Sequence, residues 1–149
     1  MKRTIIFIVI AVAILAGVFL WREGDDAQSG IPIQLVDAAS GTPIARQRAE
    51  IKDSSATCES TNYCPQPVLF EGKTDGEGKI TVSPDVFSVR QFNVLIEGYY
   101  LGGPVQQNSV RQEGRNVRIP NEYTVFYPSG AYRFNYLEDS IILKMEPRS

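Results

Sequence analysis

The sequence predicts an all-β domain, a sandwich of about seven strands, behind one N-terminal transmembrane helix. Residues 5–21 contain no charged side chain. Beyond them, short runs of alternating apolar and polar residues are separated by turn-forming residues, which is the pattern of half-buried strands. No later segment keeps the period of an amphipathic helix. We therefore expect an anchor at 1–22, a linker at 23–30 and the β domain at 31–149.

The N-terminal apolar run is long enough to anchor the chain in a membrane. Its seventeen residues would rise about 25 Å as a helix, close to the roughly 30 Å of a bilayer core. Lys2 and Arg3 precede the run, so the positive-inside rule places the N-terminus in the cytoplasm. The alternative is a cleaved signal peptide, but residues 19–22 are too bulky for a cleavage site.

This anchor decides the expected location. We expect a single-pass protein of the inner (cytoplasmic) membrane that contacts the lipid bilayer through residues 5–21. Its C-terminal domain then lies in the periplasm or outside the cell. Beyond Arg22 the chain has twelve Lys and Arg and seventeen Asp and Glu, a net charge of −5, which disfavours nucleic acid as a partner.

The absence of histidine limits the chemistry of the chain. It excludes a Ser-His-Asp triad, a Cys-His pair and His-ligated zinc or copper. No nucleophile and base form a recognisable pair in what remains. We therefore predict that the protein is not an enzyme and that it has no metal and no cofactor. A histidine-free hydrolase is the less favoured alternative.

The two cysteines, Cys58 and Cys64, are separated by five residues. In an exported chain such a pair predicts a disulfide. Two ligands are too few for a structural zinc site, and the spacing differs from the C-x-x-C of thiol oxidoreductases. A disulfide here would close a short loop and stabilise the fold by about 2 kcal/mol.

The β domain is divided by clear turn signals. Asp75 and Gly76 predict a tight hairpin turn, because glycine supplies the positive φ angle that such turns need. Ser83 and Pro84 predict the cap and first residue of a short helical turn. Candidate strands lie at 31–36, 44–52, 68–73, 79–82, 91–97, 116–119, 123–127, 131–137 and 141–145, and loops are expected at 53–67 and 101–114.

Several of these motifs resemble carboxypeptidase-regulatory-like domains, which are transthyretin-like β-sandwiches of immunoglobulin type. Residues 33–45 resemble the opening strand with its Asp and Ser-Gly-Thr-Pro-Ile turn, and residues 74–80 resemble the Thr-Asp-x-x-Gly hairpin. Residues 94–99 are similar to the strand that ends in Gly-Tyr, and 141–145 to the closing strand. The resemblance implies an attachment, folding or interaction module. The hydrolase site that resembles 5-hydroxyisourate hydrolase needs histidines, so it does not carry over.

An aromatic surface is the first candidate binding site. It falls in 101–139, which, like 53–67, is longer than in the family pattern. Alternate aromatic residues share one face of a strand. An exposed aromatic face would bind a protein or stack on a sugar ring, whereas the alternative is that the face is core. The aromatic candidates are Tyr123, Tyr127, Tyr132, Phe134 and Tyr136.

A group of arginines is the second candidate. Arg111, Arg115 and Arg118 lie close together in the sequence, and the fold could bring Arg90 near them. Such a group can dock carboxylates or phosphates, and the alternative is a solvated loop. We predict a non-catalytic protein-interaction or scaffolding module of an envelope assembly, whose contact surface is 101–137 with the cysteine loop. The alternative is a glycan- or peptidoglycan-binding module that uses the aromatic face.

Overall fold

The structure is a computed structural model that describes residues 30–55 and 65–148. The predicted anchor, all but the last residue of the predicted linker, and both cysteines lie outside these residues. Within the described ranges, no helix combines the length and the apolar character needed to cross a membrane.

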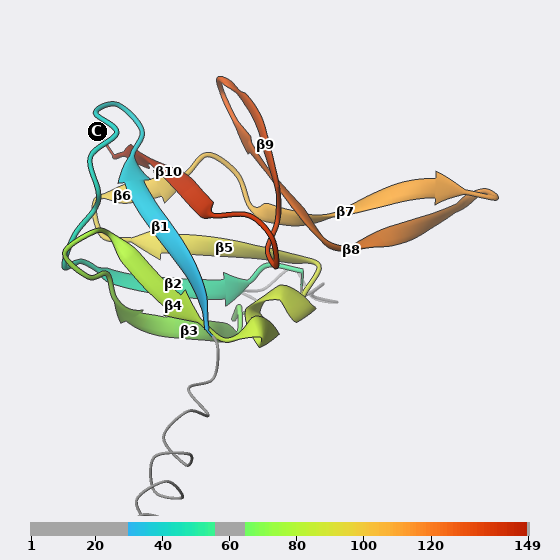
Figure 1. Ribbon diagram of the computed structural model, residues 1–149, viewed down its shortest axis with the longest axis horizontal. Coiled ribbons are helices and arrows are strands. Elements are labelled where there is room, and N and C mark those ends of the chain that lie inside the picture. The colour runs from blue at the N-terminus through green and yellow to red at the C-terminus, as the bar shows by residue number, and fades with distance from the viewer. Residues whose placement is uncertain (1–29, 56–64, 149) are drawn as a thin grey trace, which may run out of the picture.

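The described chain is all-β, as predicted (Figure 1). Ten strands form one sheet, more than the sequence predicted, and the one helical element of the described residues is the 3₁₀ helix η1, Pro84–Ser88. The strands are β1 Ile31–Asp37, β2 Arg48–Asp53, β3 Val68–Lys73, β4 Lys79–Val82, β5 Gln91–Ile96, β6 Tyr99–Leu101, β7 Val105–Gln112, β8 Arg115–Tyr127, β9 Gly130–Asn135 and β10 Ile141–Pro147.

The sheet branches at β5. One path runs β4-β1-β10-β6-β5-β7-β8-β9, and β2 joins β5 to β3. Because β2 occupies one edge of β5 along residues 92–96, β6 and β7 share the other edge. There β6 pairs with Leu95 and Ile96, and β7 pairs with Gln91 and Phe92. The β1–β10 pair is parallel, and every other named pair is antiparallel.

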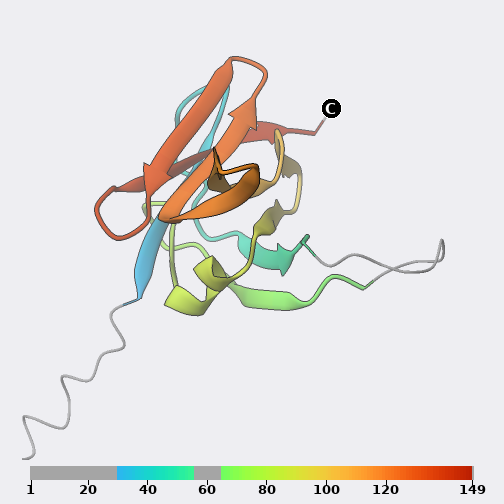
Figure 2. The same cartoon turned by 90° about the vertical axis from the view of Figure 1, so that its right-hand side faces the viewer.

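One hydrophobic core holds these strands together. Alternate residues of β1 and β5 are buried, as the sequence pattern predicted. In both views β2 and β3 lie at one side and β9 at the opposite side, so the sheet curves around the core (Figure 2). The largest fully buried side chains are Tyr123, Phe92, Phe134, Ile33, Leu35, Ile51, Leu143 and Met145.

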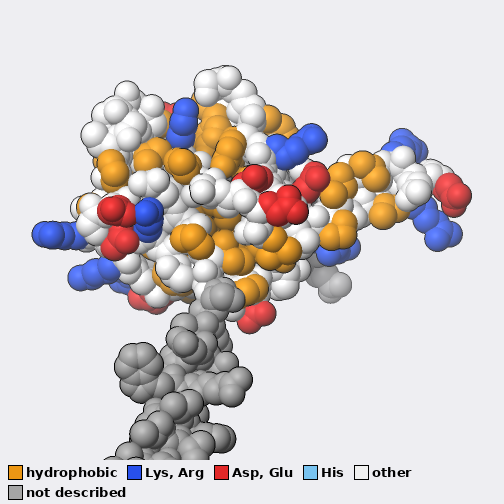
Figure 3. Space-filling view, in the orientation of Figure 1, with side chains coloured by type: hydrophobic (Ala, Val, Ile, Leu, Met, Phe, Trp, Pro, Cys, Tyr) orange, Lys and Arg blue, Asp and Glu red, His pale blue; other side chains and the backbone are white. Residues whose placement is uncertain are grey.

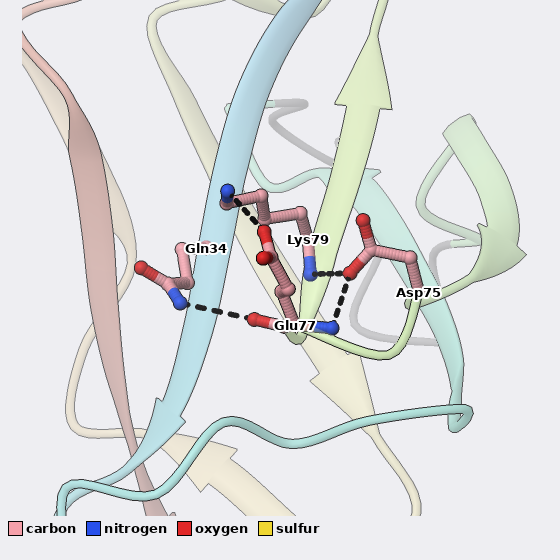
Figure 4. A network of polar contacts seen from close by, with 4 residues as sticks. All are labelled: Gln34, Asp75, Glu77 and Lys79. Atoms are coloured by element: carbon pink, nitrogen blue, oxygen red, sulfur yellow. Dashed lines mark hydrogen bonds and ion pairs between the residues drawn. The ribbon is translucent and has the colours of Figure 1, made fainter.

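The turn before β4 is organised by a carboxylate. Asp75 Oδ1 accepts the backbone N–H of Glu77 at 2.8 Å and that of Lys79 at 2.9 Å. The Lys79 ammonium pairs with the Glu77 carboxylate, and Gln34 Nε2 donates to the Glu77 carbonyl at 2.9 Å (Figure 4). A turn therefore forms where one was predicted, but it does not close a hairpin, because β3 pairs with β2 and β4 pairs with β1. The Gln34 side chain of β1 holds this turn through the Glu77 carbonyl.

The reason given for that turn was wrong in one respect. The positive φ angle lies at Gly78, at 72°, and not at Gly76. A Cβ atom at Gly78 would also lie 2.7 Å from the Leu35 carbonyl oxygen. Position 78 therefore requires glycine for its backbone angle and for the close approach of β1.

The helical turn at 83–88 is confirmed. Ser83 is its cap and Pro84 its first residue, and the Ser83 hydroxyl accepts the backbone N–H of Asp85 at 3.4 Å. Phe87 from this turn is buried. The turn therefore contributes a ring to the core as well as linking β4 to β5.

The prediction that 101–114 is a loop is wrong. Most of this stretch is strand, in β6 and β7, and β8 runs without a break through 115–127, where two strands were expected. The outer half of β7 is exposed at every residue. A strand with no core to face has no reason to alternate apolar and polar residues, and that alternation is the signal by which strands are read.

Candidate functional site

The most unusual feature of the molecule is an arm formed by residues 109–118, at the outer ends of β7 and β8 (Figure 1). It extends away from the body, and Figure 2 looks along it. Glu113 and Gly114 form its tip, and both have positive φ angles, of 49° and 78°. These are the angles of a type I′ hairpin turn, whose twist matches that of the flanking strands.

A corner separates the arm from the body. Gln107 pairs with Tyr123 and Ser109 pairs with Arg118, so β8 uses more residues than β7 to cover the same distance. The surplus residues include Asn121, whose φ angle is 65°. Bulges of this kind bend a strand and change the direction of the residues beyond the bend. The corner therefore aims the arm away from the core.

The arm has no core of its own. Every one of its strand residues is exposed, including Val110 at 48% and its cross-strand partner Val117 at 43%. A two-stranded hairpin is only marginally stable in water. Hydrophobic side chains follow the arm, and charged ones gather at its end (Figure 3).

The arm has two different faces because side chains alternate along each strand. The paired residues Val110 and Val117 share one face, which we call the apolar face, and Arg115 belongs to the same face through its pairing with Gln112. The opposite, polar face carries Ser109, Arg111, Asn116 and Arg118. The three arginines predicted as a patch are therefore divided between two faces.

The polar face ends in a pocket at the corner, which we call the corner pocket. Its volume is about 220 Å³. Arg90 joins it from the segment before β5, because its carbonyl accepts the Gln107 backbone N–H at 2.8 Å. The structure thus brings Arg118 and Arg90 together but leaves Arg111 and Arg115 outside the lining. The lining residues are Arg90, Gln107, Ser109, Asn116 and Arg118.

None of these four arginines forms an ion pair with an acidic residue of the described chain, where the ion pairs involve Arg48, Lys52 and Lys79. Nor do the described residues contain a group of three or more His, Cys, Asp or Glu placed to hold a metal ion. The chemistry that the arm offers is hydrogen-bond donation, positive charge and apolar contact.

The aromatic candidates divide into core and rim. Tyr123 is fully buried and Phe134 is 2% exposed, so these two pack inward. The Tyr123 hydroxyl donates one hydrogen bond that the Phe87 carbonyl, at 2.5 Å, and the Val89 carbonyl, at 3.0 Å, share. Burial, with Tyr136 nearby, raises the pKa of Tyr123 to about 12, although the positive charge of Arg118 acts in the opposite sense. Tyr123 therefore fastens β8 to the turn at 84–89.

The Tyr136 side chain also packs against the core. Its ring stacks on Phe87 at a centroid distance of 4.3 Å, and it is half-buried against the core. Together with Tyr123 and Phe134, it leaves little of the predicted aromatic face open to a ligand.

Tyr127 and Tyr132 lie at the rim, beside the edge of β10. The Tyr127 hydroxyl accepts the Lys144 backbone N–H at 3.0 Å, and the Tyr132 hydroxyl donates to the Ser140 carbonyl at 3.1 Å. Burial raises the pKa of Tyr127, and the hydrogen bond from Lys144 opposes this. The two rings line a groove of about 370 Å³ together with Ile142 and Lys144.

Sequence reasoning missed the apolar face of the arm. Val110 and Val117 were assigned to no surface, yet their positions carried a signal. Each valine lies three residues along the sequence from the pair Glu113-Gly114. Two apolar residues placed symmetrically about a polar residue and a glycine are typical of a hairpin. Residues 101–122 contain no aromatic residue, so a search for aromatic contact surfaces passed over this segment.

Comparison of the chain with protein-family models, with curated proteins and with solved structures finds no match. Function must therefore be argued from the site.

Proposed function

We propose that this protein is a non-catalytic interaction or scaffolding module of an envelope assembly, and that the arm docks a partner protein. Residues 5–21 would anchor it in the cytoplasmic membrane, with the β domain on the outer side. The single observation that supports this best is the Val110–Val117 pair, exposed on a two-stranded ribbon beyond the core.

The energetics of the arm support a docking role. The ribbon leaves Val110 and Val117 about half exposed, and a partner that covers the exposed half would contribute about 1 kcal/mol for each valine. The arm therefore has apolar surface still available for contact with a partner.

The charge of the arm indicates the chemistry of the partner. Residues 105–121 contain three arginines and one glutamate, a net charge of +2, so with a total of −2 the rest of the chain carries −4. A partner with an apolar patch rimmed by acidic residues would complement Val110, Val117 and Arg115. Such complementarity speeds association and fixes orientation.

We also propose that the curved sheet is a transthyretin-like sandwich of immunoglobulin type. The proposal is supported by a single hydrophobic cluster, to which β1, β4 and β10 of one branch and β2 and β5 of the other contribute buried side chains. The Cys58–Cys64 disulfide would close the loop between β2 and β3, whose base is joined by a hydrogen bond of 2.9 Å from the Asp53 N–H to the Pro67 carbonyl.

Photo-crosslinking tests the docking role. A photoreactive amino acid replaces Val117 in the full-length chain in living cells, and a matched chain carries it at Val68, which is 53% exposed on β3 of the body. We expect a discrete protein adduct from position 117 and none from 68. The adduct should weaken when Val110 is changed to Ser and should contain a protein with an acidic surface. Equal capture at both positions, or capture from 68 alone, would contradict the proposal.

Glycan binding is the second candidate, favoured by the groove that Tyr127 and Tyr132 line with Ile142. Aromatic rings beside an apolar floor suit the apolar face of a sugar. Sedimentation of the full-length chain with purified peptidoglycan tests it. A Tyr132→Ala variant that loses binding, while Val117→Ser retains it, would favour this candidate over the arm.

A further inference from the structure

We propose that the corner pocket binds a phosphate group, held between Arg90 and Arg118. This inference goes beyond the proposed function, because it concerns the polar face of the arm and not the apolar face. It rests on the composition of the pocket, on its position and on one unsatisfied atom.

The lining of the pocket consists entirely of side chains that can donate hydrogen bonds. Arg90 and Arg118 supply guanidinium groups, Gln107 and Asn116 supply amide N–H groups, and Ser109 supplies a hydroxyl. No carboxylate lines it. Such a lining repels cations and favours an anion with several acceptor oxygens.

The donors reach the pocket from three segments of the chain. Arg90 precedes β5, Gln107 and Ser109 belong to β7, and Asn116 and Arg118 belong to β8. A planar carboxylate fits the fork of one arginine. A tetrahedral anion can accept from several directions at once, and a charge near −2 balances two guanidinium groups.

Gln107 distinguishes phosphate from other tetrahedral anions. Its Oε1 atom is buried and has no hydrogen-bond partner among the described residues. Leaving a buried acceptor unsatisfied costs about 1–3 kcal/mol. A rotation of the Gln107 amide toward the pocket would let a phosphate group that retains one proton donate to this oxygen while it accepts from the arginines. Sulfate at neutral pH has no proton to donate.

The experiment titrates the full-length chain in detergent with inorganic phosphate, at a fixed ionic strength, by calorimetry. We expect saturable binding of phosphate that is about fivefold tighter than that of sulfate, since one hydrogen bond separates the two. Sulfate that binds as tightly as phosphate, or phosphate that gives no more heat than chloride, would overturn the proposal. Titration with glycerol phosphate compares an ester source with free phosphate, and the tighter of the two identifies the preferred source.

Two matched variants locate the site. Arg118→Gln should weaken phosphate binding about tenfold or more, because a charge-assisted hydrogen bond is lost. Arg115→Gln removes the same charge from the same strand on the opposite face, and it should change the affinity less than twofold. Equal weakening by both variants would show diffuse attraction to the arm and would contradict the pocket.

A further variant controls for loss of binding that is caused only by misfolding. Should Arg118→Gln lower the unfolding midpoint, Ser109→Ala removes one donor of the lining without a change in charge, and it too should weaken binding. An unchanged phosphate affinity in Ser109→Ala and Arg118→Gln together would overturn the assignment. Because no partner protein takes part, these results are independent of the crosslinking outcome.

Discussion

The body and the arm are built from the same kind of strand and differ in what their side chains face. In β5, Phe92, Val94 and Ile96 alternate with partly exposed residues and are all nearly inaccessible. In the arm, Val110 and Val117 occupy equivalent alternate positions and remain about half exposed. Apolar positions on a strand can therefore serve either as core or as contact surface, and their place in the fold decides which.

Removal of an aromatic ring from the body should destabilise the protein strongly. Phe92→Ala should lower the free energy of unfolding by about 3–5 kcal/mol, because it leaves a cavity among fully buried side chains. Chemical denaturation of the full-length chain in detergent measures this. A loss below about 1 kcal/mol would mean that the core around Phe92 is loosely packed.

The buried hydroxyl of Tyr123 joins the corner to the body, and its removal should also destabilise the protein. Tyr123→Phe should cost about 1–2 kcal/mol, because the Phe87 and Val89 carbonyls lose their donor. Since the pKa of Tyr123 is raised from 10.0 to about 12, its contribution is complete below pH 10 and is lost as the pH rises toward 12. Unfolding curves between these pH values should therefore decline less steeply in the variant than in the parent. Parallel declines would exclude Tyr123 as the titrating group.

The turn before β4 should make the stability of the protein depend on pH in the acid range. Backbone hydrogen bonds, with the one from Lys79 first, lower the pKa of Asp75 below its ordinary 3.8. A lowered pKa gives a stabilisation that is present above the ordinary value and is lost as the pH falls through the lowered one. Asp75→Asn keeps an acceptor oxygen but no charge, so its unfolding midpoint should depend less on pH in this acid range. Asp37, whose pKa is lowered mainly by hydrogen bonds from Ser40, provides a comparison of the same sign.

Substitutions in the arm should barely change the stability of the protein. Val110→Ser and Val117→Ser should each change the free energy of unfolding by no more than about 0.5 kcal/mol, because neither side chain is buried in the isolated chain. The same variants should reduce the crosslinked adduct several-fold. A large loss of stability in either variant would place the arm in the core and would remove the contrast with β5.

The sequence was informative wherever a local pattern and the core agree. The alternation of Ile31, Ile33 and Leu35, and the Ser83-Pro84 cap, predicted their elements correctly, because each signal is physical and local. The all-β character of the chain followed from the same signals. The branching of the sheet at β5 could not be predicted, since pairing between distant strands leaves no mark in a single sequence.

The candidate site was predicted only in part. The arginines were singled out, but their division between two faces depends on the turn at Glu113-Gly114 and on the corner near Asn121. The aromatic residues were also singled out, but burial of Tyr123 and Phe134 depends on how the sheet curves. The sequence identifies which candidate residues are charged, whereas only the fold shows which of their side chains are exposed.

Hydrogen–deuterium exchange of the full-length chain, alone and with the protein captured at position 117, tests the docking role most directly. We predict rapid exchange across 109–118 in the free chain and slow exchange in β1 and β10. On binding, the arm should gain protection while β1 and β4 remain unchanged. Protection gained on the body, with the arm still exchanging rapidly, would contradict the claim that the arm is the docking element.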